Sequence, residues 1–567
     1  MKPSMLKLIL CLGALTLPTC FAQGDGSDLE KLKAQLAEQQ RQIESLKKNL
    51  VETERMIENL SKAQEDTKAA VDSAVAAAAA KPAPSPSTDG STAPGVTKLG
   101  GDLASTTPVL SPPPPAAARE PFQNPAPPAP LQLQLGNITI TPIGFLDAAG
   151  VWRNKNAGSG IGSNFGSIPF DNAVPGGKLG EVRFSPQNSR VGFRIDGNFK
   201  GIKFINYLET DFLGTGAANN IGVTNGAFVP RLRLFWVSMR KGGWEMLGGQ
   251  SWSMFSANRK GISALPGDIF YSQVFDVNYL IGMPWTRQES FRVLYHGNND
   301  KMTFGLSAEA PNQYMGGYGG GGQIVLPAAL SAVGGTQLDN GSASFLSTPN
   351  LAPDIIAKVA FDPTSRVHFE VGGITRVFKI YNTSTGQPTS GQTFTKHGQG
   401  GEANANVEVV KGLRLISNNQ FGAGIGRYFF GNAPDVVVRA DGSLSPIHTF
   451  TTTDGFEATI QKTLLYFYFG GIYIGKNVAV DTNGSLIGWG YTGSANSQNR
   501  SVNEYTFGIN QTLWKNPAYG AINLMLQYEY ATRTPWYVAP GALDHASDST
   551  IYWDLRYTLP GSAPSGK

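Results

Sequence analysis

The chain has 567 residues, in which 46 Lys and Arg are set against 42 Asp and Glu, so the formal net charge is only +4. A surplus this small does not indicate a nucleic-acid partner, and an apolar content of 41% is ordinary. Beyond the N-terminus, no apolar run approaches the roughly 18 residues that a membrane-spanning helix needs. The composition argues against a helical membrane protein, and the length leaves room for a large domain with appendages.

Residues 1–22 have the pattern of a secretory signal peptide. A basic start is followed by an apolar stretch over residues 8–17 and by small residues that favour a cut after Ala22. Cys11 and Cys20 are the only cysteines of the sequence, so the mature protein is expected to have no disulfide and no thiol ligand for a metal. The alternative, lipid attachment at Cys20, fits poorly with the Pro-Thr pair that precedes it.

A seven-residue repeat covers residues 28–66 and predicts a periplasmic coiled coil. The first seam holds Leu29, Leu36, Ile43, Leu50 and Ile57, and the second holds Leu32, Gln39, Leu46, Thr53 and Leu60. Gln39 and Thr53 weaken the core and are expected to fix the register or the number of strands. The alternative is a lone amphipathic helix, which would find no surface to pack against in the segment that follows.

Residues 67–132 are rich in alanine and proline. The segment contains an alanine run and ends in proline clusters at residues 112–115 and 125–128. Such a composition cannot bury an apolar core, so it predicts a disordered, extended linker.

From residue 133 to residue 567, the sequence predicts an all-β transmembrane barrel of about 16 antiparallel strands. Short segments alternate between apolar and polar residues, and the links between them are alternately very short and very long. The expected strands are 136–152, 181–197, 201–213, 231–240, 244–252, 288–297, 300–309, 353–362, 365–380, 401–411, 413–430, 455–462, 464–476, 502–513, 520–532 and 549–559. Long links are improbable in a compact soluble domain but normal on the outer rim of a barrel. An even strand count places both ends of the barrel on the periplasmic side.

The alternation also assigns a face to each side chain. In the fourth strand, Leu232, Leu234 and Trp236 are expected to face lipid, opposite Arg231 and Arg233. An Arg or Lys on the lipid face costs roughly 2–4 kcal/mol at mid-bilayer. The charged face must therefore point inward, and the interior must hold water.

Inward-facing charges gather on the second to sixth predicted strands. These candidate pore-lining residues are Arg190, Arg194, Arg231, Arg233, Arg292, Lys203, Glu209 and Asp211. Guanidinium groups bind carboxylate and phosphate oxygens through paired hydrogen bonds, and a basic wall concentrates anions in a narrow pore. The pattern favours selectivity for anionic solutes. In the alternative, Glu209, Asp211 and Asp196 neutralise the arginines, and the pore selects only weakly.

Two predicted hairpins resemble hairpins of trimeric Gram-negative outer membrane porins. The first carries Ser-Arg-Val-Gly-Phe at residues 189–193, then Gly-Ile-Lys at 201–203 and Glu209. The second carries Arg-Leu-Arg-Leu-Phe-Trp-Val at residues 231–237, then Leu-Gly-Gly-Gln-Ser at 247–251. The coiled coil and proline-rich spacer before the barrel are similar to those of the dicarboxylate-channel (DcaP-like) porins. This resemblance implies a sixteen-stranded homotrimer with periplasmic helices that passes small carboxylates.

In large porins the third long loop folds into the barrel, and the resemblance gives residues 253–290 the role of narrowing the pore. The candidate constriction-loop residues are Arg259, Lys260, Asp268, Tyr271 and Arg287. The alternative is an external loop or a contact between subunits of a trimer. The chain departs from the porin pattern at its C-terminus, where residues 560–567 follow the last strand and the usual terminal aromatic residue is missing.

No catalytic arrangement is visible in the sequence. Its five histidines are scattered without the spacing of a zinc site, so we expect no enzyme, metal or cofactor. The predicted function is a water-filled outer membrane porin for passive diffusion of small anionic solutes. Expected partners are a homotrimer, membrane lipid or lipopolysaccharide, the solutes and, through the N-terminal region, peptidoglycan, but no nucleic acid. The alternative is an envelope tether whose coiled coil contacts the cell wall.

Overall fold

A computed structural model describes residues 131–157, 160–214, 228–341, 351–382 and 391–562. The predicted signal peptide and coiled coil lie outside the described residues, as does the predicted linker apart from its last two residues. Within the described part of the chain, no helix is long and apolar enough to cross a bilayer.

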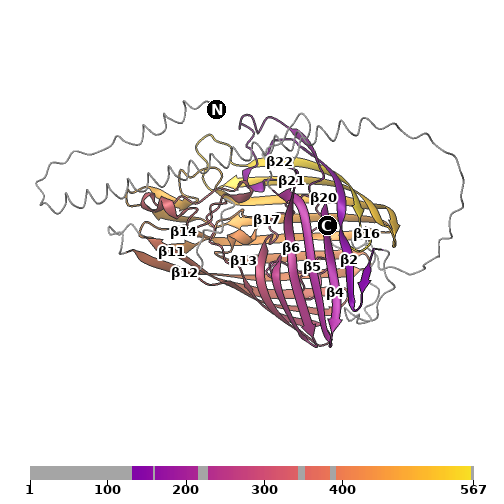
Figure 1. Ribbon diagram of the computed structural model, residues 1–567. Helices are drawn as coiled ribbons and strands as arrows, with labels where there is room; N and C mark the ends of the chain where they lie inside the picture. The colour runs from indigo at the N-terminus through magenta and orange to yellow at the C-terminus, as the bar shows by residue number, and fades with distance from the viewer. Residues whose placement is uncertain (1–130, 158–159, 215–227, 342–350, 383–390, 563–567) are drawn as a thin grey trace, which may run out of the picture. The chain divides into compact units, whose positions relative to one another are not determined.

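Sixteen antiparallel strands of the described residues form a closed barrel, which confirms the barrel part of the predicted fold class (Figure 1). In chain order they are β2 (Ile138–Arg153), the interrupted strand made of β3 (Glu181–Ser185) and β4 (Arg190–Phe199), β5 (Ile202–Gly214), β6 (Val229–Lys241), β7 (Trp244–Trp252), β8 (Arg287–Gly297), β9 (Met302–Glu309), β10 (Asp354–Thr364), β11 (Val367–Asn382), β12 (Gln392–Val410), β13 (Leu413–Ala423), β16 (His448–Ile460), β17 (Thr463–Ile474), β20 (Asn499–Asn516), β21 (Gly520–Pro535) and β22 (Ala546–Thr558).

The first and last strands of the barrel meet at a seam. β2 pairs directly with β22, which closes the sheet into a cylinder. Across the seam, the Arg556 guanidinium reaches the Asp147 carboxylate, with 2.6 Å between Nε and Oδ1. The short strand β1 (Leu133–Leu135) forms a hairpin with the start of β2. Backbone pairing and an ion pair therefore both hold the closure.

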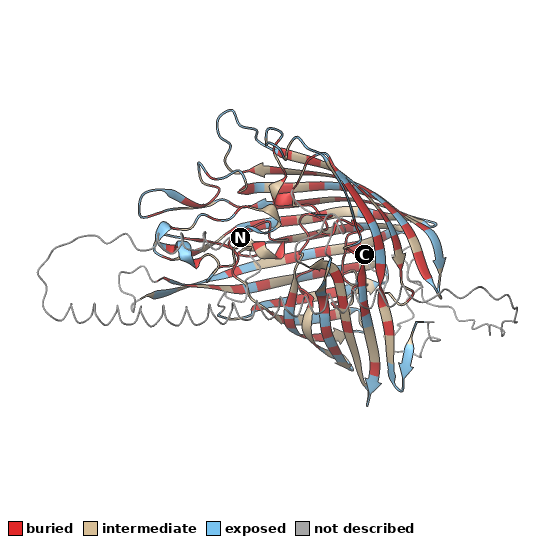
Figure 2. Cartoon of the chain, turned by 45° about the horizontal axis from the view of Figure 1, so that its top comes forward, coloured by how far each residue is buried: buried red, intermediate tan, exposed pale blue. Residues whose placement is uncertain are grey.

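Buried and more exposed residues alternate along the strands (Figure 2), and the exposed ones on the outer face are mostly apolar whereas many of the buried ones on the inner face are polar. In β22, Ile551 and Leu555 are 43% and 48% exposed on the outer wall, whereas Asp554 and Arg556 are buried inside. Lipid can solvate the apolar face but cannot satisfy ionised side chains. The charged face therefore points inward, as the sequence predicted.

The strand predicted at residues 181–197 is interrupted at residues 186–189. Here the Ser189 N–H donates to the Pro186 carbonyl at 3.0 Å, which forms a tight turn between β3 and β4. The Ser189 hydroxyl accepts a hydrogen bond from the Asp147 N–H at 2.9 Å, so it replaces a missing ladder partner. Proline has no N–H to give to the ladder, which explains why the strand breaks here.

A β-bulge overturns the predicted orientation of part of the fourth strand. β6 sets two residues, Arg233 and Leu234, against Glu209 of β5. Beyond the bulge the side chains change face, so Leu234 and Trp236 are buried inside the barrel and Phe235 is exposed outside. The prediction that Leu234 and Trp236 face lipid was therefore wrong. Apolar residues occupy both faces at this point, so the alternation could not reveal the inserted residue.

The tight turns lie at the predicted links. Gly242 and Gly412 have φ angles of 59° and 86° there, a region that favours glycine. β11 and β12 extend beyond their predicted ends at residues 380 and 401 and leave only residues 383–391 between them. Outside the bilayer a strand needs no strict apolar alternation, so the sequence pattern could not show this extension.

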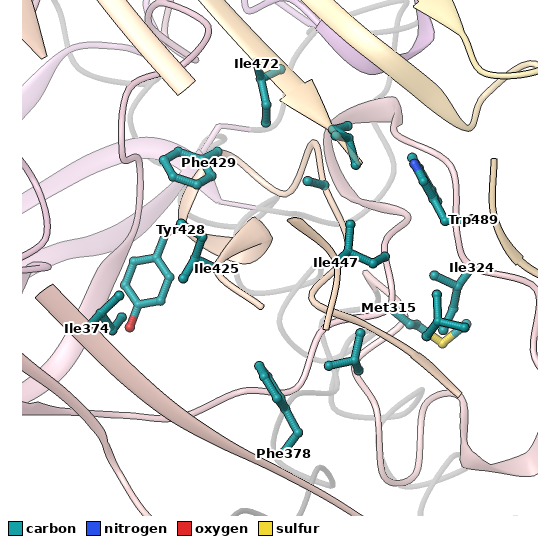
Figure 3. Close-up of a cluster of buried hydrophobic side chains, with 14 of the residues drawn as sticks. Met315, Ile324, Ile374, Phe378, Ile425, Tyr428, Phe429, Ile447, Ile472 and Trp489 are labelled. Atoms are coloured by element: carbon teal, nitrogen blue, oxygen red, sulfur yellow. The ribbon is translucent and has the colours of Figure 1, made fainter. Parts of the chain in front are cut away.

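The long loops after β9, β13 and β17 pack together around an apolar core (Figure 3). Their short elements are η2 (Tyr318–Gly320), η3 (Ala328–Val333), η5 (Gly426–Tyr428), β14 (Val436–Val438), β15 (Leu444–Pro446), β18 (Asn477–Val480) and β19 (Leu486–Trp489), while η1 (Phe165–Ser167) belongs to the first long loop. The core residues labelled in Figure 3 include Met315, Ile324, Tyr428, Phe429, Ile447 and Trp489. Val325 and Gly488 exchange two backbone hydrogen bonds of 3.0 Å between two of these loops. The loops thus form a folded cap whose apolar core continues into the barrel wall and the third long loop.

Candidate functional site

The third long loop, residues 253–286, runs through the inside of the barrel. Its backbone N–H groups donate to inward-facing wall side chains on several strands, most of them remote from β7 and β8, where the loop begins and ends. Met254 donates to Glu309 (2.7 Å), Asn258 to Glu370 (2.9 Å), Gln273 to the Tyr468 hydroxyl (3.1 Å), Phe275 to Gln527 (2.9 Å) and Ile281 to Glu504 (2.9 Å). These acceptors lie on β9, β11, β17, β21 and β20, so the loop crosses the lumen from wall to wall.

Arg259 ties this loop to β16. Its Nη2 lies 2.6 Å from Glu457 Oε1 and also donates to the Tyr271 carbonyl at 2.8 Å. The neighbouring Lys260 is exposed, and the Asp268 carbonyl accepts a hydrogen bond from the Arg259 N–H at 2.6 Å. Burial raises the pKa of the Asp268 carboxyl, and it raises the pKa of the Tyr271 phenol well above its usual range. These four predicted constriction-loop residues therefore lie together on one part of the loop.

Three predicted pore-lining arginines form an ionic cluster with two carboxylates on β4, β5 and β6. Arg233 joins both acids, because its Nε lies 2.8 Å from Glu209 Oε1 and its Nη1 lies 2.8 Å from Asp211 Oδ2. Arg231 is 2.7 Å from Asp211, and Arg190 is 3.6 Å from Glu209. The Arg231 side chain is 35% exposed, whereas those of Arg190 and Arg233 are each 2% exposed. Arg231 is thus the member most open to solvent.

Arg287, at the start of β8, adds a guanidinium to this cluster without an acid of its own. It lies over the Trp252 ring at 5.4 Å from the centroid, and Arg233 lies over the same ring at 5.9 Å. In the part of the chain that the structure describes, no carboxylate forms an ion pair with Arg287, and its Nη1 has no hydrogen-bond partner. Four guanidinium groups therefore meet two carboxylates, which leaves a surplus of two positive charges on this wall.

The remaining predicted pore-lining residues are paired locally or lie elsewhere. Arg194 is 2.6 Å from Asp196, and Arg292 is 3.5 Å from Glu309 while it also donates to the Trp252 carbonyl. Lys203 lies at the start of β5, close to the short turn after β4. These two ion pairs add no net charge, so the surplus is concentrated around Arg287.

Aromatic side chains pack between the third long loop and the arginine cluster. Trp285 lies 4.1 Å from Trp252 and 3.5 Å from Tyr279 between ring centroids. The Tyr279 hydroxyl accepts a hydrogen bond from Arg190 Nη2 at 2.9 Å. Sequence reasoning did not assign a role to Trp252 or Tyr279. The signal for them was the density of Trp and Tyr at the two ends of the loop.

The wall acceptors of the loop were also missed from the sequence. Glu309, Glu370, Glu457 and Glu504 each occupy an inward-facing strand position and bind the loop. Their signal was an acidic residue on the wet face of a strand without an assigned partner. Among the described residues, no group of three His, Cys, Asp or Glu side chains is placed to hold a metal ion.

A closed sixteen-stranded barrel with a charged inner wall and a loop folded through its lumen defines the fold of an outer membrane porin. No protein-family model matches the chain, and no curated protein sequence matches it. Among solved structures, the chain is similar to the outer membrane channel DcaP of Acinetobacter baumannii, with 14% identity and a TM-score of 0.53. That match covers 75% of this chain and 99% of the DcaP chain.

Two further solved structures match with lower TM-scores. The anion-selective porin from Comamonas acidovorans has 13% identity and a TM-score of 0.41, covering 74% of this chain and 100% of that chain. Salmonella typhi OmpF in complex with daunomycin has 10% identity and a TM-score of 0.39, covering 76% and 100%. The match to DcaP confirms, for the fold, the resemblance to outer membrane porins and to DcaP-like channels in particular.

Proposed function

We propose that the chain forms a water-filled channel in the outer membrane for passive diffusion of small anionic solutes of carboxylate or phosphate type. The observation that carries this proposal is the surplus of guanidinium groups on the wall formed by β4, β5, β6 and β8. In a confined aqueous path, fixed positive charge raises the local concentration of anions and lowers that of cations.

Within this channel the residues have different roles. Arg231 and Arg287 meet the passing solute, because both are partly exposed and, within the described residues, Arg287 forms no ion pair with an acid. Arg190 and Arg233 are buried and hold Glu209 and Asp211 in place. The third long loop narrows the lumen, and the exposed Lys260 adds a positive charge along it.

The test replaces Arg287 with Gln and measures the reversal potential of single channels in a KCl gradient. We expect a shift toward cations, with the ratio of anion to cation permeability reduced at least about twofold. A unit charge about 7 Å from an ion in water contributes roughly 0.6 kcal/mol, which is close to RT.

The matched control is the double variant R194Q/D196N, which removes a paired charge of each sign and leaves the net charge unchanged. We expect its reversal potential to stay at the wild-type value. An unchanged potential in R287Q, or an equal shift in the control, would contradict the proposed role of the surplus charge.

We further propose that the protein is a homotrimer embedded in outer membrane lipid and lipopolysaccharide, with its N-terminal coiled coil in the periplasm and able to contact peptidoglycan. The heptad repeat at residues 28–66 supports trimerisation.

Conductance in planar bilayers separates the channel from the alternative of an envelope tether, because a tether with a blocked lumen would pass no current.

A further inference from the structure

A histidine on the inner wall lies between two carboxylates that hold the third long loop. His368 of β11 is buried, with its side chain 2% exposed. Its Nδ1 lies 2.9 Å from Asp362 Oδ1 on β10, and its Nε2 lies 3.4 Å from Glu370 Oε2 on its own strand. We call this arrangement of Asp362, His368 and Glu370 the acid–histidine–acid bridge.

Each carboxylate of the bridge uses its other oxygen to bind the loop. Asp362 Oδ2 accepts a hydrogen bond from the Gly261 N–H at 2.9 Å, and Glu370 Oε1 accepts one from the Asn258 N–H at 2.9 Å. One oxygen of each acid therefore faces the imidazole ring, and the other faces the loop backbone. The same two side chains set both the orientation of the ring and the docking of the loop.

The two ring contacts require the doubly protonated form of the imidazole. An ionised carboxylate only accepts hydrogen bonds, and a neutral imidazole carries a proton on one nitrogen alone. Because both nitrogens face carboxylate oxygens, only the imidazolium can donate at both ends. Loss of one proton turns a nitrogen lone pair toward a carboxylate oxygen, which replaces an attraction with a repulsion. The contact from Nε2 to Glu370 is the longer of the two, so it is the one expected to break.

Acids outnumber cations on the strands that surround the ring. Lys358 of β10 lies 3.2 Å from Glu370 and 3.0 Å from Glu402 of β12, and Asn404 of β12 donates to Glu370 at 2.8 Å. With the imidazolium present, two positive charges face the three negative charges of Asp362, Glu370 and Glu402. Without the ring proton, Lys358 alone faces the same three acids. The charge balance at the loop anchor thus depends on this one proton.

The other charged groups near the bridge belong to the loop, to the neighbouring strands and to the short turns. On the loop, the Asp268 carboxyl interacts electrostatically with Lys260 and with Asp362. Glu408 of β12 and Arg414 of β13 form an ion pair of 3.7 Å. The turns next to the bridge carry exposed cations at Lys301 and Arg366. Histidine is the only one of these residue types whose unperturbed titration lies between about pH 5 and about pH 8.

We infer that the acid–histidine–acid bridge is a proton-dependent contact that docks the first part of the third long loop. While His368 is an imidazolium, it holds Asp362 and Glu370 where their remaining oxygens meet the loop backbone. When the ring loses a proton, Glu370 turns away from it and the loop segment around Asn258 loosens. The channel therefore widens as the pH rises. The inference rests on the proposed narrowing of the lumen by this loop, but it holds whether or not the channel selects anions.

The first test replaces His368 with Gln and records single channels from about pH 5 to about pH 10. In the wild type, we expect the time spent in states of higher conductance to increase at least about tenfold with rising pH, the factor that one hydrogen bond to a charged group contributes. H368Q cannot become cationic and is expected to show the high-pH behaviour throughout. A transition of equal size in H368Q, or no transition in the wild type, would overturn the inference.

The matched control is His296→Gln on β8. His296 also lies between two acids, 2.8 Å from Glu245 and 3.9 Å from Asp300, and its side chain is 10% exposed. Those acids bind Ser238 and Arg240 of β6. We expect H296Q to keep the wild-type transition. An equal loss of the transition in both variants would assign it to the general electrostatics of the lumen, and the inference would fail.

The second test measures the docking of the loop without any current. Ala257 of the loop is buried and the only natural cysteines lie within residues 1–22, so Ala257→Cys supplies a single reporter thiol. At a fixed pH of about 6, we expect a maleimide to label A257C at least about tenfold faster when H368Q is also present. Heat-modifiable mobility on a gel shows that each variant still contains a folded barrel.

Equal labelling rates with and without H368Q would show that the ring does not hold the loop. Faster labelling in a protein that passes no current would support the bridge and contradict the proposed channel. The two proposals can therefore fail separately.

Discussion

Arg259 of the third long loop forms a salt bridge with Glu457 on β16, with 2.6 Å between Nη2 and Oε1. The two side chains are 10% and 5% exposed, so water screens the pair only weakly. The pair holds the first part of the loop against β16, which is not adjacent to β7 or β8. Because the loop occupies the path of a solute, the strength of this contact bears directly on the width of the pore.

We expect Glu457→Gln to loosen the loop and raise the single-channel conductance, with more frequent current fluctuations. The substitution leaves the largely buried guanidinium of Arg259 without the opposite charge of Glu457. This costs the docked loop about 1–3 kcal/mol. Asp300→Asn serves as the control, because it breaks the Arg240–Asp300 pair at the short turn between β8 and β9, where Asp300 is 40% exposed. If both variants conduct like the wild type, Arg259 does not restrain the loop.

Gly282 allows the third long loop to approach the backbones of β16 and β17 closely. Its φ is +84°, and an added Cβ would press on the Thr452 carbonyl and lie 2.7 Å from the Gly471 carbonyl oxygen. We expect Gly282→Ala to lower the free energy of unfolding by about 1–3 kcal/mol, which combines backbone strain with overpacking. The matched control is Gly484→Ala, where φ is +85° and nothing lies within 4 Å of the added Cβ. Equal losses in thermal stability for the two variants would show that the close approach is unimportant.

Asp268 should make the stability of the protein fall as the pH rises. Burial raises its pKa in the folded state above the value of about 3.9 for an unfolded chain. The folded state therefore binds more protons in the window between the two pKa values, and stability declines as the pH rises through that window. We expect Asp268→Asn to remove this decline, measured as unfolding temperature from pH 3 to pH 8 in detergent.

Asp441 provides a control of opposite sign, because the Ser443 backbone N–H lowers the pKa of its carboxyl. Any contribution of Asp441 is present above its unfolded pKa and is lost as the pH falls through its folded pKa. Asp441→Asn should therefore leave the decline at rising pH in place. A decline that persists in Asp268→Asn would assign it to another group.

Tyr428 connects the cap of long loops to the third long loop. Its ring packs edge-on against Phe255 at 5.6 Å, its hydroxyl donates to Asp354 at 2.8 Å, and its carbonyl accepts from the Trp285 N–H at 2.7 Å. We expect Tyr428→Ala to cost about 3–5 kcal/mol in unfolding free energy and Tyr428→Phe about 1 kcal/mol. Thermal unfolding in detergent measures both, and comparable losses would place the energy in the hydroxyl rather than in the ring.

The fold could be predicted because two-residue alternation is imposed separately on every strand that crosses lipid. β22 shows this most clearly, since Ile551 and Leu555 alternate with Asp554 and Arg556 along a strand with lipid on one side and water on the other. The pattern failed where that contrast disappears. After the inserted residue at Arg233–Leu234 apolar side chains occupy both faces, and near the end of the β11–β12 hairpin the strict apolar alternation is lost.

The candidate site was predictable only as a collection of charged residues. Alternation put Arg190, Arg231, Glu209 and Asp211 on the inner face, where the structure has them. It could not tell that Arg287 lacks an acid, because ion pairing depends on distances between strands and on the path of a loop. The contact between Arg259 and Glu457 joins residues that lie 198 positions apart, and no local pattern encodes such a pairing.

The seam between β2 and β22 has a consequence for biogenesis. Asp147 and Arg556, which meet across the seam, are separated by 409 positions in the sequence. Nearly the whole domain must therefore become ordered, with the loss of conformational entropy that this entails, before the two residues can pair. Closure is therefore a late event that awaits the final strand. A polypeptide truncated before β22 would leave the backbone hydrogen-bonding groups of β2 and β21 unpaired at two open edges. Periplasmic chaperones and proteases would then act on an open sheet rather than on a closed barrel.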